Sequence, residues 1–171
     1  MIHTIGHSIH PQEAFASLLQ AHGIRQLADV RLIPQSRRQP HFCRDSLDSF
    51  LRLHGIAYRH FPELGGRRRP RADSANTAWR EEAFRGYADY MGTPVFERAI
   101  ESLIQFSGGA SSVVMCAESV WWRCHRRLLS DALVVRGVAV FHILSAAAAK
   151  PHELSEFARV EHGRLTYPGL I

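Results

Sequence analysis

The chain has 171 residues, of which 46% are apolar and 22% are charged, and its formal net charge is +5. These values are typical of one soluble domain, and no apolar run approaches the roughly 20 residues of a membrane span. The three cysteines are too few for a disulfide framework and the first residues lack a signal-peptide profile, so we expect a cytoplasmic protein with no membrane partner. The positive charge favours an anionic partner, either a small molecule or a nucleic acid.

Helix and strand patterns alternate along most of the chain. Three amphipathic segments end on Gly23, Gly55 and Gly137, and a β-branched residue follows each glycine. The strands predicted around these segments span residues 2–6, 24–30, 56–61, 113–116 and 138–144. Strands that are each reached through a helix form a mostly parallel sheet. We therefore predict a single α/β domain over residues 1–171, a three-layer sandwich of about five strands in the order 3-2-1-4-5 with helices on both faces.

Residues 62–92 interrupt this alternation. Their first part is rich in glycine, proline and arginine and has no strand periodicity. Long excursions in compact domains are often lids or binding loops, and we predict that role here. Helices are predicted from Trp79 to Met91 and from Pro94 to Phe106, and a last short helix from His152 to Glu161.

Polar and titratable residues follow nearly every predicted strand. Because the carboxyl ends of parallel strands meet at one edge of a sheet, we expect these residues to share a site there. The predicted catalytic residues are Cys116, Glu118, Asp29, His7 and Glu63. The predicted ligand-binding residues are Gly6, Ser8, Arg31, Ser36, Arg123, Cys124, His125 and Arg126.

The helix predicted to begin near Cys124 favours anion binding. Its free N–H groups and dipole attract negative charge, and Arg123 and Arg126 can add forked hydrogen bonds. The same positive charge would favour a thiolate at Cys116, which makes that residue a candidate nucleophile. However, six residues separate Cys116 from Arg123, one more than in the phosphate-binding loop of tyrosine phosphatases, and a buried structural cysteine is the alternative.

Two other functions are open at this point. Cys116, Cys124 and His125 could be ligands of zinc or iron, but adjacent Cys-His ligands are geometrically awkward and no Cys-x-x-Cys pair is present. We therefore predict no metal and no cofactor. The basic run from Arg67 to Arg71 could contact phosphate backbones, although no spacing typical of sequence-specific recognition accompanies it.

Several short motifs occur in order along the chain. They are Thr4-Ile5-Gly6-His7-Ser8, Asp29-Val30-Arg31 with Pro34 and Ser36, Pro62-Glu63-Leu64-Gly65-Gly66, and Cys116-Ala117-Glu118 with Cys124-His125-Arg126. Together they resemble the prokaryotic domain-of-unknown-function 488 family over nearly the whole chain. The resemblance implies a compact α/β fold and a shared site at the motif positions, but no established reaction.

The interpretation that these residues favour is an enzyme, either a hydrolase or a transferase, that binds a phosphorylated or nucleotide-like anion at the carboxyl edge of the sheet. A nucleic-acid-binding accessory protein and a Cys/His metalloprotein are the alternatives. The pattern indicates no particular oligomeric state.

Overall fold

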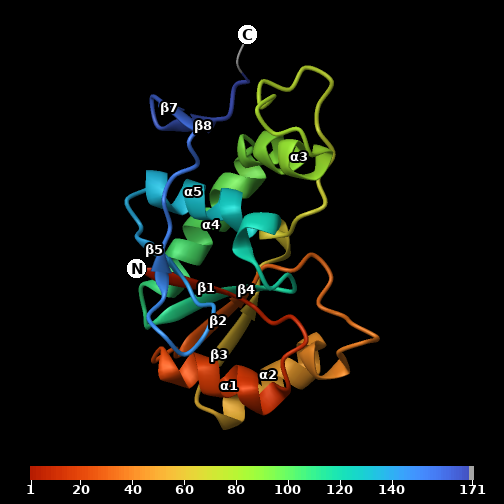
Figure 1. Ribbon diagram of the computed structural model, residues 1–171, viewed down its shortest axis with the longest axis vertical. Coiled ribbons are helices and arrows are strands. Elements are labelled where there is room, and N and C mark those ends of the chain that lie inside the picture. The colour runs from red at the N-terminus through yellow and green to blue at the C-terminus, as the bar shows by residue number, and fades with distance from the viewer. Residues whose placement is uncertain (170–171) are drawn as a thin grey trace.

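A six-stranded sheet forms the middle layer of the protein in the computed structural model, which describes residues 1–169 (Figure 1). Its strands are β1 (Ile2–Gly6), β2 (Gln26–Asp29), β3 (Ala57–His60), β4 (Ser112–Cys116), β5 (Val140–His142) and β6 (Lys150–Pro151). The order is β3-β2-β4-β1-β5-β6, and every neighbouring pair is parallel except β5 with β6. A mostly parallel sheet delivers the carboxyl ends of β1 to β5 to the same edge.

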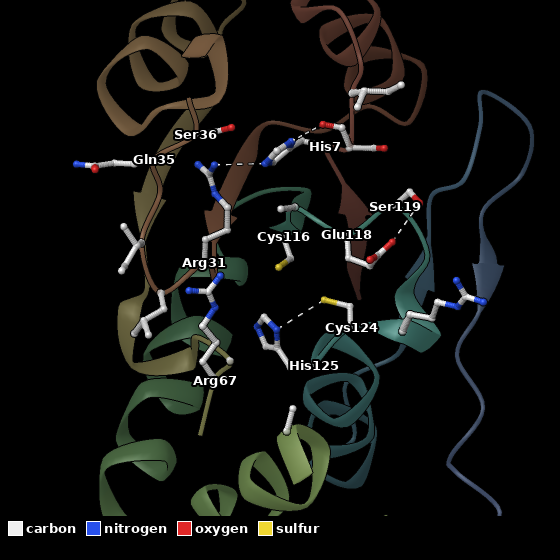
Figure 2. Close-up of a pocket in the computed structure, with 18 of the residues that line it drawn as sticks. His7, Arg31, Gln35, Ser36, Arg67, Cys116, Glu118, Ser119, Cys124 and His125 are labelled. Atoms are coloured by element: carbon white, nitrogen blue, oxygen red, sulfur yellow. Dashed lines mark hydrogen bonds between the residues drawn. The ribbon is translucent and has the colours of Figure 1, made fainter. Parts of the chain in front are cut away.

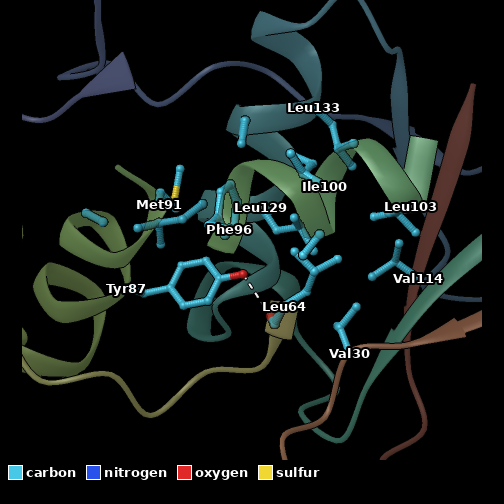
Figure 3. Packing of buried hydrophobic residues seen from close by; sticks show 14 of the residues in the cluster. Val30, Leu64, Tyr87, Met91, Phe96, Ile100, Leu103, Val114, Leu129 and Leu133 are labelled. Carbon is cyan, nitrogen blue, oxygen red and sulfur yellow. Dashed lines mark hydrogen bonds between the residues drawn. The ribbon is translucent and has the colours of Figure 1, made fainter. Parts of the chain in front are cut away.

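Helices cover both faces of this sheet. The helices α1 (Gln12–Ala21) and α2 (Arg44–Leu53) pack on one face, and α4 (Pro94–Ser107) and α5 (Arg126–Val135) pack on the other, with α3 (Glu82–Met91) beyond them (Figure 1). One apolar cluster lies under α1 and α2. A larger one lies between the sheet and the other three helices, and Figure 3 shows part of it. The predicted three-layer α/β fold is confirmed.

The predicted order of the two central strands was wrong. β4 lies between β2 and β1, so the order is 3-2-4-1-5 with β6 added, and not 3-2-1-4-5. The side chains Val113, Val114 and Met115 of β4 are completely buried, as expected for the most enclosed strand of a parallel sheet. The consequence for the site is that the end of β4 is flanked on one side by the end of β1 and on the other by the end of β2.

The C-terminal segment contains a hairpin where a helix was predicted. β7 (Arg159–Glu161) pairs antiparallel with β8 (Arg164–Thr166), and the turn between them places His162 and Gly163 at φ values of 50° and 76°. Two consecutive residues at positive φ are typical of the two-residue turns that match the twist of a hairpin. The short helix predicted from His152 to Glu161 was therefore wrong.

Residues 62–92 are held in place by hydrogen bonds to their own helix. A 3-10 turn at Pro62–Leu64 begins the segment, and the hydroxyl of Tyr87 donates to the carbonyl of Leu64 at 2.8 Å (Figure 3). Asp89 accepts hydrogen bonds from the side chain of Ser74 at 2.6 Å and from the side chain of Asn76 at 2.7 Å. Helix α3 begins at Glu82 and not at the predicted Trp79, because Trp79 packs edge-on against an aromatic cluster outside the helix.

None of the helices within residues 1–169 has both the length and the apolar character that crossing a membrane requires.

Candidate functional site

A cavity of about 770 Å³ opens at the carboxyl edge of the sheet (Figure 2). Predicted site residues that line it are His7, Ser8, Arg31, Ser36, Cys116, Glu118, Arg123, Cys124 and His125. The rest of the cavity wall comes from residues 62–92, from the turns after β1 and β2, and from the loop after β4. Among these residues are Ile9, Ile33, Gln35, Gly66, Arg67 and Phe84. The ends of three neighbouring strands therefore contribute to one cavity, as the parallel-sheet argument predicted.

The turn after β1 extends the pairing of β1 with β4 into the site. The backbone N–H groups of His7 and Ser8 donate to the carbonyls of Cys116 and Ala117, both at 2.9 Å. Gly6 is required because the loop after β4 crosses it: a Cβ atom here would lie 1.8 Å from the carbonyl oxygen of Glu118. Gly6 thus shapes the site through its backbone and offers no side chain to a ligand.

A buried polar network lies at the carboxyl edge of the sheet and consists of Asp29, Arg31 and His7. Asp29 is fully buried and accepts a forked pair of hydrogen bonds from the Arg31 guanidinium, at 2.9 and 2.6 Å. The hydroxyl of Tyr58 donates to the same carboxylate at 2.6 Å. Asp29 therefore fixes the position of Arg31 and does not itself line the cavity.

His7 is neutral near pH 7, because burial lowers its pKa to about 4. Its Nδ1 lies 2.9 Å from the carbonyl of Ser8, so Nδ1 carries the proton and donates. Nε2 then accepts from Nη1 of Arg31 at 3.3 Å (Figure 2). The ring also stacks on Phe42 at 4.2 Å between centroids. Both ring nitrogens of His7 are thus engaged, one by the backbone of Ser8 and the other by Arg31.

Two cysteines and one histidine converge on the other side of the cavity. Cys116 is the last residue of β4, Cys124 follows the 3-10 turn Trp121–Arg123, and His125 precedes α5. One ligand atom from each of the three lies within 4.8 Å of the others, and Nδ1 of His125 is 3.6 Å from Sγ of Cys124. In Figure 2 the Cys116 sulfur points toward the space between Cys124 and His125.

The contacts around the two sulfurs favour a thiolate at Cys124 over one at Cys116. The facing Cys116 thiol, His125 and Arg126 together lower the pKa of the Cys124 thiol well below its ordinary value, although burial opposes them. The neighbouring Cys124 and burial raise the pKa of Cys116. The thiolate that the sequence placed at Cys116 is thus better supported at Cys124.

Arg126 lies behind the cavity. It is 1% exposed, its Nε donates to Sγ of Cys124 at 3.4 Å, and its Nη2 donates to the carbonyl of Glu118. It therefore positions the sulfur and the loop after β4, and it is not among the residues that line the cavity.

The remaining predicted residues divide into those that face the cavity and one that does not. The carboxylate of Glu118 points toward Ser119, whose hydroxyl lies 3.3 Å away, and not toward the cysteines (Figure 2). Ser36 lines the cavity while its hydroxyl accepts from the backbone of Gln39 at 2.9 Å. Glu63 is exposed and outside the cavity lining, so the structure does not bring it to the other site residues.

Arg67 is a charged cavity residue that the site prediction missed. It belongs to the basic run, which the sequence presents as a solvated loop, and its φ of 62° is unusual for a residue other than glycine. The neighbouring Gly66 was the sequence feature that could have pointed to Arg67, since a Cβ atom at Gly66 would lie 3.0 Å from Nδ1 of His125. A glycine at this point indicates that the excursion approaches the cysteine cluster closely.

Other members of the basic run are engaged within the protein. The guanidinium of Arg68 donates to the carbonyl of Gly65 at 3.2 Å and lies 3.8 Å from the centre of the Tyr90 ring. Arg71 forms an ion pair with Asp73 at 2.9 Å. Fewer arginines of this run are therefore free to contact a phosphate backbone than the sequence suggested.

The fold and site define a class of protein: a three-layer α/β domain with a cavity at the carboxyl edge of its sheet, lined by two thiols, two imidazoles and several guanidinium groups. The model of the family described as domain of unknown function DUF488 matches residues 11–133, more than half of the chain. The chain therefore belongs to the DUF488 family, which confirms the family that the motifs indicated; the first of those motifs, at residues 4–8, lies outside the matched range. No curated protein and no solved structure matches it significantly.

Proposed function

We propose that the protein is an enzyme that binds a phosphorylated or nucleotide-like anion in the cavity and acts on it through the sulfur of Cys124. One observation carries the proposal: the cysteine pair and the exposed cations Arg67 and Arg123 line the same cavity. A cavity of about 770 Å³ is in the size range of small-molecule sites. The excess of positive charge over the whole chain supports an anionic ligand.

Arg67 and Arg123 would hold the anion. Both are exposed, and neither forms an ion pair within the described residues 1–169. Arg31 lines the cavity between them and His7, but its charge is already compensated by Asp29. A guanidinium with free donors can form forked hydrogen bonds to a phosphate, so these two arginines are the better candidates for direct contact.

Cys124 would be the nucleophile, and Cys116 and His125 would support it. A thiolate is a stronger nucleophile than a thiol, and Arg126 and the Cys116 S–H group stabilise charge on Sγ of Cys124. Nδ1 of His125 lies 3.6 Å from that sulfur, close enough to exchange a proton with it. Attack by this sulfur on the phosphorus of a bound phosphate ester would form an S–P bond and break the P–O bond to the alcohol, which leaves and takes up a proton. Transfer of the phosphoryl group from sulfur to an acceptor fits a transferase, and transfer to water, which releases phosphate, fits a hydrolase.

We assign residues 62–92 the role of a binding loop. Gly66, Arg67, Ala83 and Phe84 from this segment line the cavity. The hydrogen bonds to Leu64 and within the segment support a fixed wall, so the segment would supply contacts to the ligand without opening and closing.

All cysteines of the chain are unpaired, which favours a reducing compartment such as the cytoplasm.

Titration calorimetry with inorganic phosphate and nucleoside monophosphates tests the binding. We expect Arg67→Gln and Arg123→Gln each to weaken binding about tenfold, the effect of losing one charge-assisted hydrogen bond. Arg98→Gln on the exposed side of α4 is the matched control and should bind as the wild type does. Equal affinity in all four proteins, or no binding by the wild type, would refute the anion site.

Assays of phosphate release from the bound nucleotides and from phosphomonoesters test the chemistry. Turnover should be lost in Cys124→Ser and kept in Cys43→Ser, whose sulfur lies outside the cavity lining. Binding of oligonucleotides that falls steeply with added salt, without any turnover, would instead identify a nucleic-acid-binding accessory protein.

A second candidate is a metal site, because Cys116, Cys124 and His125 are grouped as metal ligands are. Ligands at the usual zinc distances of about 2.3 Å for sulfur and about 2.0 Å for nitrogen lie roughly 3.5 Å apart in a tetrahedron, close to the observed 3.6 Å. One equivalent of zinc or iron in protein purified without chelator, absent from Cys124→Ser, would establish this function in place of the thiolate.

A further inference from the structure

The two cysteines of the cavity are spaced for chemistry with each other. Their sulfurs lie within 4.8 Å, whereas the sulfur of the third cysteine, Cys43, is engaged with the backbone of Ser36 at 3.4 and 3.6 Å. A disulfide needs a sulfur separation of about 2.05 Å, so Cys116 and Cys124 must approach by less than 3 Å.

The backbones of the two cysteines are held differently. Cys116 ends β4 and is held there by pairing with Gly6, so its main chain is fixed. Cys124 has extended backbone angles, φ −127° and ψ 151°, between a 3-10 turn and α5, so it lies outside any regular helix. A rotation at either side chain, with small adjustment of the segment before α5, can bring the sulfurs together.

We infer that Cys116 and Cys124 form a reversible disulfide when a small disulfide compound enters the cavity. Both residues line the cavity, so an oxidant of this class has a route to them. Cys116 is the more exposed of the two, while Cys124 is 5% exposed and receives the Nε donor of Arg126.

The reaction proceeds by two exchanges. The sulfur of Cys124 attacks one sulfur of the compound RSSR, a mixed disulfide forms at Cys124, and RS⁻ leaves and takes up a proton. Cys116 then loses its proton and attacks the Cys124 sulfur, which breaks the mixed disulfide and releases the second RSH. The two protein thiols are oxidised, and RSSR is reduced to two RSH.

Oxidation would switch off the proposed enzyme, and this consequence rests on the proposed function. The disulfide consumes the nucleophilic sulfur and ties the end of β4 to the start of α5. The enclosed segment contains Glu118 and the candidate anion ligand Arg123. A reductant would restore both the thiolate and the freedom of this segment.

The test uses the 171-residue chain, dialysed first against a chelator and then exposed to bis(2-hydroxyethyl) disulfide. Trypsin cuts after Arg98, Arg123 and Arg126, so the two cysteines fall in separate peptides, residues 99–123 and 124–126. We expect mass spectrometry without reductant to find these two peptides joined, and to find them separate after dithiothreitol.

Three variants identify the roles of the sulfurs. Cys116→Ser should accumulate a mixed disulfide at Cys124, because the second exchange cannot occur. Cys124→Ser should leave Cys116 at least tenfold less modified than Cys124 is in Cys116→Ser. Cys43→Ser should form the same cross-link as the wild type.

Several results would overturn the inference: no cross-link in the wild type, a cross-link that requires Cys43, or mixed disulfides at equal rates on all three cysteines. Retention of a metal that protects both cysteines after dialysis would also overturn it. Phosphate binding by the reduced protein is measured separately. A cross-link without phosphate binding would refute only the proposed function. Phosphate binding without a cross-link would refute only the disulfide.

Discussion

Replacing Gly6 with alanine tests whether the loop after β4 crosses the end of β1 as closely as the structure shows. A Cβ atom at this position would lie 1.8 Å from the carbonyl oxygen of Glu118 and 2.8 Å from Cα of Ser119. Both are backbone atoms, so the loop must move by about 1 Å or more to restore ordinary contact. The Glu118 carbonyl also accepts a hydrogen bond from buried Arg126, and this bond would be lost in the same movement.

The two costs can be added for an order-of-magnitude estimate. Overpacking in a well-packed region costs about 1–3 kcal/mol. Losing a hydrogen bond to a charged group costs about 1.5–3 kcal/mol more. We therefore expect Gly6→Ala to lower the free energy of unfolding by roughly 2.5–6 kcal/mol, a large part of the 5–15 kcal/mol that is typical of a domain.

Urea unfolding followed by circular dichroism measures this loss, and Gly137→Ala is the matched control. Gly137 has a φ of 78° with no atom within 4 Å of its would-be Cβ, so alanine there suffers only backbone strain, about 1–2 kcal/mol. An unfolding midpoint for Gly6→Ala that equals or exceeds that of Gly137→Ala would refute the close crossing. Failure of Gly6→Ala to fold while Gly137→Ala folds would support it.

Acid should destabilise the protein below about pH 6.5, because burial lowers the pKa of His7 to about 4 and that of His142 to about 3. The unfolded chain takes up both protons near the ordinary histidine pKa, so the stability that is present above this pH is lost as the pH falls. The loss in the free energy of unfolding is about 1.5 kcal/mol per histidine between pH 6.5 and pH 5. Urea midpoints that stay constant over this range would contradict the reasoning. Tyr167→Phe removes a hydroxyl that donates at 2.8 Å to Asp131, which is completely buried, and should lower the free energy of unfolding by about 1.5–3 kcal/mol. In the same unfolding assay Tyr90→Phe, whose hydroxyl donates to an exposed backbone carbonyl, should lose less than about 1 kcal/mol, and equal losses would argue against a stabilising buried network.

The parts of the fold that could be predicted are those encoded locally. The run from Ser112 to Cys116 reads as a buried strand because its side chains are apolar on both faces, and Thr93-Pro94 marks the start of α4 because the threonine side chain accepts from Phe96 N–H at 3.3 Å. Which strand pairs with which is a non-local property. The position of β4 between β1 and β2 therefore did not follow from the pattern.

The carboxyl-edge argument placed most candidate residues at one cavity, but it did not assign their individual environments. Arg126 occupies the first turn of α5, where arginines often reach solvent, yet its guanidinium is buried behind Cys124. The charge of the cysteine pair depends on three side chains brought together in space, so no spacing along the chain indicates which of the two sulfurs would carry it. Arg67 was missed because a basic loop residue lines a cavity only through a tertiary contact of its neighbour Gly66.

The rate of alkylation by iodoacetamide at each cysteine, with and without a nucleotide, tests the central claim most directly because it measures the thiolate and the anion site together. At pH 7 we predict that Cys124 reacts faster than Cys43 in the reduced, metal-free protein, and that a bound nucleoside monophosphate slows only the cavity cysteines. Equal rates at Cys43 and Cys124 that the nucleotide leaves unchanged would contradict a thiolate-bearing anion site at this edge of the sheet.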